Sequence, residues 1–225
     1  MTTAAGLEAA RLDPPPWRNP RISRRTALRR DRAAGAAFDG LGRRTLVAPI
    51  GWLPAWRDAL MQETGDAADE ILTAIGAGWG AADMAAFIGR ASDEFGDELV
   101  RIHMAVALQT WWWPFNAGGW GVARFDYGRS GQKWIRADVA DSAWARAAGA
   151  ARRPVCHLYA GLFAGALSRL TGRTLIGVET QCRACDGVDC RFLVTTDLRA
   201  AAIREWRRAG LHADEIESRL AGAGR

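Results

Sequence analysis

The chain has 225 residues, and because 49% of them are hydrophobic it can build an ordinary domain core without help from disulfides. Its formal net charge is +5, and its basic residues crowd between positions 18 and 44 instead of forming a stripe on a folded face, which disfavours a nucleic-acid reader. No run of 18 apolar residues suggests a membrane span, and the arginine pair Arg24–Arg25 lacks the apolar segment of an export signal. We therefore expect a cytoplasmic protein with reduced thiols, and the basic segment favours a peripheral role at the anionic surface of the inner membrane.

The chain divides into an arm, a domain and a tail. Residues 1–45 hold few core-forming side chains and several prolines, so we predict a flexible Pro- and Arg-rich arm. Residues 46–210 are predicted to form a single ligand-binding domain. Residues 211–225 have the apolar spacing of a short amphipathic helix, with Ile216 and Leu220 on its buried side.

Residues 50–115 show the apolar spacing of helices. One helix is predicted to end at Gly65, the next to begin after Asp66, and a longer one to begin after Asp93, because aspartate caps helix N-termini. The best candidate for a dinucleotide fingerprint is the sequence GAGWGA at residues 76–81. It follows a predicted helix, whereas the fingerprint requires a preceding strand, so it gives little support for a nicotinamide site.

The second half of the chain changes pattern. Alternating and β-branched stretches predict two hairpins, with strands at residues 118–127, 133–139, 173–180 and 190–196. Helices are predicted between the hairpins, from Pro154 to Gly172, and after them, from Asp197 to Gly210. The order of helices, hairpin, helix, hairpin and helix predicts an α+β fold in which helices pack on one face of an antiparallel sheet.

The four cysteines all fall within a short part of the chain, at Cys156, Cys182, Cys185 and Cys190. In a reduced compartment, thiols at such spacing indicate a metal site before disulfides. Spacing alone favours a four-cysteine site that ties the helix after Pro154 to the second hairpin. Buried free cysteines are the alternative. A catalytic thiol is disfavoured, because the nearby His157 is adjacent to Cys156 on a helix and points in a different direction.

These motifs resemble a known family. The segments Pro154-Val155-Cys156-His157, Gly161 with Gly165, Val178-Glu179-Thr180-x-Cys182-Arg183 and Cys190-Arg191-Phe192 resemble the vinyl-4-reductase domain, over about residues 118–196. The resemblance implies a fold shared with vesicle-tethering TRAPP subunits, and commonly a homodimer. In the phenol-sensing transcription activators of that family, zinc is bound by a Cys, a Glu and two further Cys. The matching positions here are Cys156, Glu179, Cys182 and Cys190, which makes Glu179 a ligand of a structural zinc and leaves Cys185 spare.

The chain is rich in tryptophan, with eleven in all, and flat side chains of this kind line pockets for large flat ligands. Ordinary core packing is the alternative for each one. Three consecutive side chains cannot all point one way, so at least one of Trp111, Trp112 and Trp113 is expected to be exposed or in an interface. The predicted ligand contacts are His103, Trp111, Trp112, Trp113, Trp120, Arg124 and Trp134.

Two of these contacts carry open alternatives. His103 lies beside an apolar helix stripe, so it is either a buried structural histidine or a pocket residue, even an axial ligand to a chlorin magnesium. Phenol sensors of the resembled family line their pocket with a His and a Trp, for which His103 and Trp134 are counterparts. Arg124, with Arg136 on the next strand, either pairs with a ligand carboxylate or remains a solvated edge charge.

As a whole, the chain resembles the members of this family that serve bacteriochlorophyll biosynthesis. We therefore expect a tetrapyrrole-binding accessory or carrier protein, which holds a Mg-porphyrin or chlorophyllide-type ligand and meets other bacteriochlorophyll-synthesis enzymes. The first alternative is a 4-vinyl reductase acting on divinyl (proto)chlorophyllide, although no nicotinamide or flavin site is visible in the sequence. The second alternative is a small-molecule-sensing regulatory domain.

Overall fold

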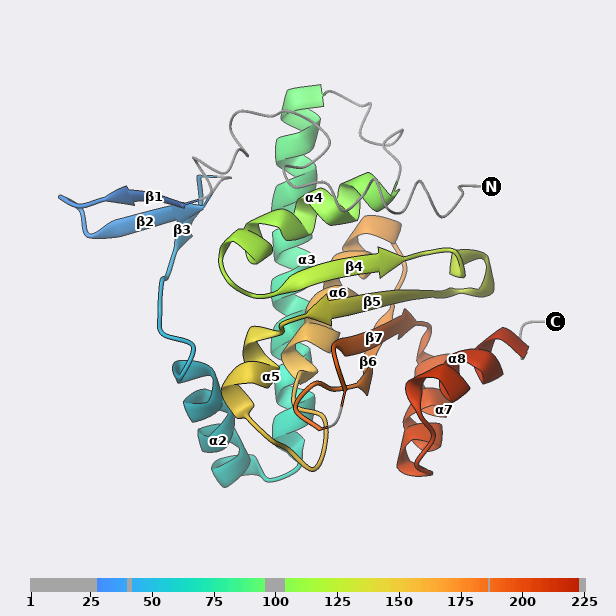
Figure 1. The fold of residues 1–225 in the computed structure, drawn as a ribbon. Coiled ribbons are helices and arrows are strands. Elements are labelled where there is room, and N and C mark those ends of the chain that lie inside the picture. Colours follow the sequence, from blue (N-terminus) through green and yellow to red (C-terminus); the bar gives the residue numbers. More distant parts are fainter. Residues whose placement is uncertain (1–27, 40–41, 96–103, 186, 223–225) are drawn as a thin grey trace.

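The computed structural model describes residues 28–39, 42–95, 104–185 and 187–222 (Figure 1). The helices are α2 Trp52–Thr64, α3 Ala67–Phe95, α4 Met104–Ala117, α5 Ala143–Ala148, α6 His157–Thr171, α7 Asp197–Arg208 and α8 Ala213–Gly222. The strands are β1 Leu28–Asp31, β2 Ala36–Asp39, β3 Arg44–Thr45, β4 Val122–Asp126, β5 Trp134–Ala140, β6 Ile176–Gln181 and β7 Cys190–Thr195, with a short 3-10 turn (η4) at Ser130–Gln132. The predicted α+β class and both predicted hairpins are confirmed.

The main sheet has the order β4-β5-β7-β6, and every neighbouring pair is antiparallel. α6 lies against one face of this sheet, and α3 lies behind α6 as a second helical layer (Figure 1). On the other face, α7 and α8 pack on Trp134, Val178 and Leu193. The expectation that helices cover only one face is therefore wrong. Strands β6 and β7 bury side chains on both faces, so each face requires its own helical cover.

α3 is a single helix of 29 residues, not a short helix followed by a loop and a new helix. It continues through Gly76 and Gly80, and Asp93 lies in its last turn instead of capping a later helix. The glycines mark a close crossing with α6. A Cβ added at Gly76 would lie 2.1 Å from the Leu158 carbonyl oxygen, and one added at Gly161 would lie 2.0 Å from the Thr73 carbonyl oxygen. The GAGWGA motif therefore serves helix packing, and by length and composition alone α3 could also cross a membrane, as a core helix often could.

Residues 28–45, which the sequence assigns to the arm, contain the small antiparallel sheet β1-β2-β3. One buried carboxylate, Asp83 of α3, joins this sheet to the core. Its Oδ1 accepts a hydrogen bond of 2.5 Å from Arg43 Nη1, and its Oδ2 accepts one of 2.8 Å from Trp111 Nε1. Asp83 thus satisfies a buried indole N–H and an arginine from a distant segment at the same time.

Replacing Asp83 by alanine is expected to lower the free energy of unfolding by about 2–4 kcal/mol, because the buried Trp111 N–H loses its acceptor and Arg43 loses its partner. Urea unfolding monitored by circular dichroism measures this loss. The matched control is Glu63→Ala, which removes an exposed carboxylate from α2 and should change the unfolding free energy by less than about 0.5 kcal/mol. Equal stability of the two variants would contradict the anchoring role of Asp83.

Candidate metal centre

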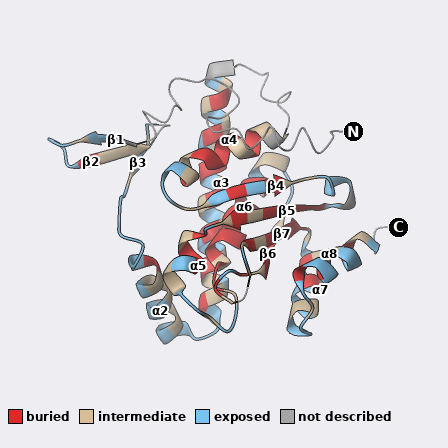
Figure 2. Cartoon of the chain, viewed as in Figure 1, coloured by how far each residue is buried: buried red, intermediate tan, exposed pale blue. Residues whose placement is uncertain are grey.

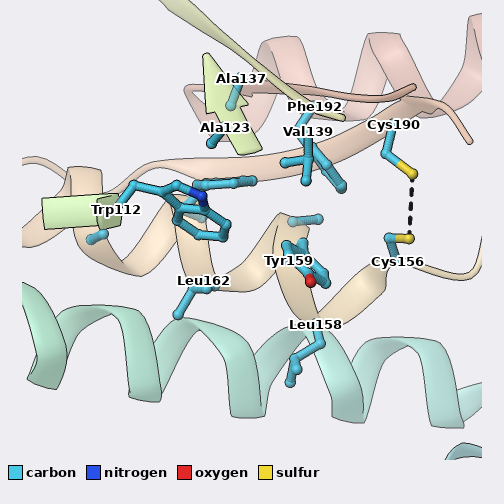
Figure 3. Packing of buried hydrophobic residues seen from close by; sticks show 14 of the residues in the cluster. Trp112, Ala123, Ala137, Val139, Cys156, Leu158, Tyr159, Leu162, Cys190 and Phe192 are labelled. Atoms are coloured by element: carbon cyan, nitrogen blue, oxygen red, sulfur yellow. Dashed lines mark hydrogen bonds between the residues drawn. The ribbon is translucent and has the colours of Figure 1, made fainter. Parts of the chain in front are cut away.

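Three elements bring four potential ligands together at one end of the sheet. Cys156 occupies the N-cap position of α6, Glu179 lies in β6, Cys182 follows β6 directly, and Cys190 is the first residue of β7. All four are buried, and their ligand atoms lie within 4.8 Å of one another. Figure 3 shows the sulfur atoms of Cys156 and Cys190 facing each other between the start of α6 and β7. A group of this kind can hold a metal ion.

Local features of β6 place Glu179 toward α6. A Cβ at Gly177 would lie 2.0 Å from the Ala160 carbonyl oxygen, so only glycine allows the strand to approach the helix this closely. The close approach lets Glu179 Oε2 accept a hydrogen bond of 2.8 Å from the Cys156 backbone N–H. From the opposite face, Arg207 of α7 donates a hydrogen bond to the Glu179 carbonyl oxygen. Glu179 is therefore held by both its side chain and its backbone.

The turn after β6 positions Cys182. The Cys182 carbonyl oxygen accepts hydrogen bonds of 3.1 Å from the backbone N–H groups of both Cys185 and Gly187, which closes the turn. Gln181 Nε2 donates across its base to the Asp189 carbonyl oxygen, at 3.1 Å. The turn returns the chain to Cys190 at the start of β7, so that Cys182 and Cys190 both reach the same point.

The geometry of the donors fits a tetrahedral ion. The Sγ atoms of Cys156 and Cys190 are 3.6 Å apart. Two thiolates on a tetrahedral ion with metal–sulfur bonds of about 2.3 Å would be about 3.8 Å apart. Glu179 Oε1 is buried and has no hydrogen-bond partner in the described part of the chain. A buried carboxylate oxygen without a partner is costly, and a cation among the four side chains would supply its missing contact.

The electrostatics of the group also favour a cation. Burial raises the pKa of the Cys156 thiol and of the Glu179 carboxyl well above their usual values. Hydrogen bonds from the Cys156 and Cys190 thiols lower the pKa of Cys182. The Arg183 backbone N–H lies 3.4 Å from Cys190 Sγ, where it can donate to a thiolate. A bound metal ion would replace the protons that the four side chains share, because metal ligands must be deprotonated.

Two neighbours are outside the group. Cys185 is half-buried and does not belong to the four clustered side chains, so the geometry matches the Glu179-containing set that the resemblance implies instead of the four-cysteine set that spacing favours. His157 Nε2 lies 3.0 Å from the Pro154 carbonyl oxygen and 3.3 Å from Asp69 Oδ2. Burial lowers the pKa of His157. Its ring is engaged by these oxygen atoms and does not form a pair with a thiol.

The tryptophan run on α4 is buried as a whole. Trp111, Trp112 and Trp113 are each at most 6% exposed, so the expectation that at least one faces outward is wrong for this chain. α4 is covered on more than one side, because Trp111 bonds Asp83 of α3 while Trp112 Nε1 donates to the Gly121 carbonyl oxygen at 2.9 Å. Figure 3 shows Trp112 beside Leu162 and Tyr159 of α6 in the packed core.

The other predicted ligand contacts are spread over the fold. Trp120 is half-buried and lies 5.0 Å from Trp79, centroid to centroid, and its carbonyl oxygen accepts a hydrogen bond from Tyr159. Arg124 is exposed on β4. Trp134 packs with α7 and α8 on the opposite face of the sheet from Trp111, so these residues do not line one pocket. His103 lies outside the described residues.

Trp134 instead lines a cavity of about 570 Å³ between the tip of the first hairpin and α8, together with Arg129, Asp214, Glu217, Ser218, Ala221 and Gly222. Arg136 does not reach out for a ligand, because it pairs with Asp138 at 3.0 Å and with Glu217 at 3.2 Å. This resolves one alternative from the sequence in favour of an internal ion pair.

The segment from β5 to the end of β7 contains all four clustered side chains and the helix that Cys156 caps. Residues 135–196 of this segment match the family model of the vinyl-4-reductase domain. The match includes Cys156, Glu179, Cys182 and Cys190, so the vinyl-4-reductase domain of this chain contains the whole candidate metal centre. The resemblance of this domain seen in the sequence is confirmed.

Solved structures extend the likeness beyond the matched domain. The phenol-responsive sensory domain of the transcription activator PoxR, determined with phenol, superposes with a TM-score of 0.62 at 19% identity, covering 86% of this chain and 91% of that domain. A vinyl-4-reductase family protein from Methanocaldococcus jannaschii has a TM-score of 0.43 at 15% identity, with 68% and 85% coverage. The first of these likenesses shows a shared fold. A comparison with curated proteins found no match.

Sequence reasoning missed two residues that shape the centre. Ser142 is fully buried, accepts a hydrogen bond from Ala145 N at the start of α5, and has its Oγ 3.5 Å from Cys156 Sγ. Gly177 permits the approach of β6 to α6. A glycine inside an otherwise β-branched strand is a signal of close backbone approach and could have identified Gly177. No comparable pattern in the sequence indicates Ser142.

Proposed function

We propose that Cys156, Glu179, Cys182 and Cys190 bind a structural zinc ion. Three thiolates and a carboxylate in a tetrahedral arrangement suit zinc better than the hard cations that prefer oxygen ligands. All four ligands come from the protein, and the site is buried, so there is no open position for a substrate or water. The ion would stabilise the junction of α6 with β6 and β7 and would take no part in a chemical step.

We further propose that the domain binds a small organic molecule, and that in this chain the ligand is a magnesium tetrapyrrole intermediate of bacteriochlorophyll synthesis. The observation that carries this proposal is on α4. Thr110 is buried, and its hydroxyl has no hydrogen-bond partner among the described residues, although it directly precedes the aromatic residues Trp111–Trp113. A polar atom of a large aromatic ligand would satisfy it.

Other features are consistent with this proposal. The chain contains a vinyl-4-reductase domain, and the sensory domain that shares its fold was determined with phenol bound. The whole-chain resemblance supplies the pigment class. A carrier of this kind would act as a homodimer and pass its ligand to other enzymes of bacteriochlorophyll synthesis, binding no nucleic acid.

Two alternatives differ in what they require. A 4-vinyl reductase needs a site for nicotinamide or flavin, but the dinucleotide-like glycines lie inside α3, where Gly76 and Gly80 pack against the α6 backbone. A small-molecule sensor is favoured by the fold shared with the phenol-responsive domain, and it would need a partner that supplies an output such as DNA binding. The carrier needs neither addition.

The test is a spectroscopic titration of the zinc-loaded full chain with divinyl protochlorophyllide, followed by NADPH. We expect tryptophan quenching and a shifted Soret band that remain unchanged after NADPH, and weaker binding by Thr110→Val. A time-dependent change to the monovinyl spectrum would show a reductase. Binding of phenol without binding of the pigment would show a sensor and refute the carrier.

A further inference from the structure

The connection between β3 and α2 exposes an unusual number of large apolar side chains. Leu46 is 80% exposed, Val47 58%, Ile50 42% and Trp52 44%. Half of the eight large hydrophobic residues that are exposed in the described part of the chain therefore fall within residues 46–52. Figure 2 shows this connection as an exposed stretch of chain beside the body of the domain. Scattered apolar residues need no explanation, but a concentrated set of this kind marks an interaction surface.

The small sheet that precedes this connection is strongly basic. Arg29, Arg30, Arg32 and Arg44 are all exposed. Strand pairing aligns Arg29 with Phe38 and Phe38 with Arg44, so these three side chains share one face, where the Arg29 guanidinium lies 4.6 Å from the Phe38 ring centroid. The sheet therefore presents arginines and an aromatic ring together.

The acidic residues of the same sheet are occupied internally. Asp31 accepts hydrogen bonds from the backbone N–H groups of Ala33 and Ala34 and so closes the β1–β2 turn. Asp39 pairs with Arg43 at 2.7 Å, and Arg43 also reaches Asp83 in the core. The outward-facing arginines are thus left to give the sheet a net positive surface, while Arg43 fixes the sheet to the domain.

We propose that residues 46–52 insert into the interfacial region of an anionic lipid bilayer while the arginines of β1–β3 bind lipid phosphate groups. Leucine, valine and isoleucine beside a tryptophan, flanked by arginines, have the composition of interfacial membrane anchors. Each basic residue near an anionic bilayer adds to the attraction. A second copy of this chain would fit the apolar residues less well, because two basic sheets would repel each other.

The sheet and the connection lie on the same side of the domain, and the sheet stands away from the main body (Figure 1). This arrangement lets the arginines and the apolar residues reach a flat surface together without unfolding the core. Membrane contact at this side would leave the metal centre, at the junction of α6 with β6 and β7, away from the bilayer.

The test is co-sedimentation of the full chain with vesicles of phosphatidylcholine alone or mixed with phosphatidylglycerol. We expect binding to the mixed vesicles, little binding to the neutral ones, and weakening by salt. The double variant Leu46→Asp/Val47→Asp should lose most of the bound fraction. Arg30→Gln and Arg44→Gln should each weaken binding about fivefold.

The matched controls carry the same substitutions on α7. Leu198→Asp removes a side chain that is 84% exposed, and Arg204→Gln removes an exposed arginine, so both should bind vesicles as the parent does. Thermal unfolding confirms that all variants fold. Equal binding to neutral vesicles, equal loss in the controls, or self-association that Leu46→Asp/Val47→Asp abolishes while vesicle binding is absent would each overturn the proposal.

Discussion

A Cys190→Ala variant is expected to lose its zinc and to unfold far more easily than the parent protein. Cys190 begins β7 and contributes one of the four clustered ligand atoms, so its loss leaves the ion with an incomplete set and frees the junction of α6 with the second hairpin. Because metal binding and folding are coupled at such sites, we expect a loss of more than about 4 kcal/mol in the free energy of unfolding. Metal content by mass spectrometry and urea unfolding measure the two effects.

Two further variants separate the competing ligand sets. Cys185→Ala is the matched control, because Cys185 lies in the same turn but outside the clustered side chains, and it should retain zinc at full occupancy. Glu179→Ala should lose zinc, since it removes the only oxygen ligand of the set. The opposite pair of results, zinc lost in Cys185→Ala and kept in Glu179→Ala, would establish the four-cysteine site and refute the one proposed here.

The second large effect is expected at the crossing of α3 with α6. A methyl group at Gly80 would lie 2.1 Å from the Leu162 carbonyl oxygen, and one at Gly165 would lie 2.0 Å from the Ala77 carbonyl oxygen. Backbone atoms cannot rotate away as a side chain can, so the helices must separate. Gly80→Ala and Gly165→Ala should each lower the free energy of unfolding by about 3 kcal/mol or more.

Gly78 provides the control within the same helix. A Cβ at Gly78 meets nothing within 4 Å, so Gly78→Ala should stabilise the protein by up to about 1 kcal/mol through helix propensity alone. The shift of the urea midpoint should therefore have opposite signs at two positions only two residues apart. Destabilisation of similar size at Gly78 and Gly80 would show that helix contact is not the cause.

Elements with a strong local pattern were predictable. The alternation of β4, the turn before β5, and the helix from Pro154 to Gly172 all have signatures in a single stretch of sequence, and the structure confirms them. α3 was not predicted as one helix because its glycines have the same local signature as a turn. Whether a glycine ends a helix or lets another helix approach depends on a partner some 80 residues away, here α6.

The candidate metal centre shows the same boundary between local and distant information. Cysteine spacing located the cluster, because thiols close together in sequence have few other roles in a reduced compartment. Spacing could not select Glu179 over Cys185, since a carboxylate in a strand resembles any other strand residue. The selection came from the resemblance to a family, and physically it depends on Gly177, which brings β6 against α6. The tryptophans likewise could not be assigned to faces of the sheet before the layers were known.

The glycine crossing also has a mechanical consequence. α3 is about 43 Å long at 1.5 Å per residue, and it is joined to α6 by direct backbone contact near its middle, without intervening side chains that could change rotamer. Such a joint cannot slide in small steps. α6 begins at the metal centre, while α3 carries Asp83 with its bonds to Trp111 and Arg43. A tilt of α3 would therefore turn the metal end and the basic sheet as one rigid lever.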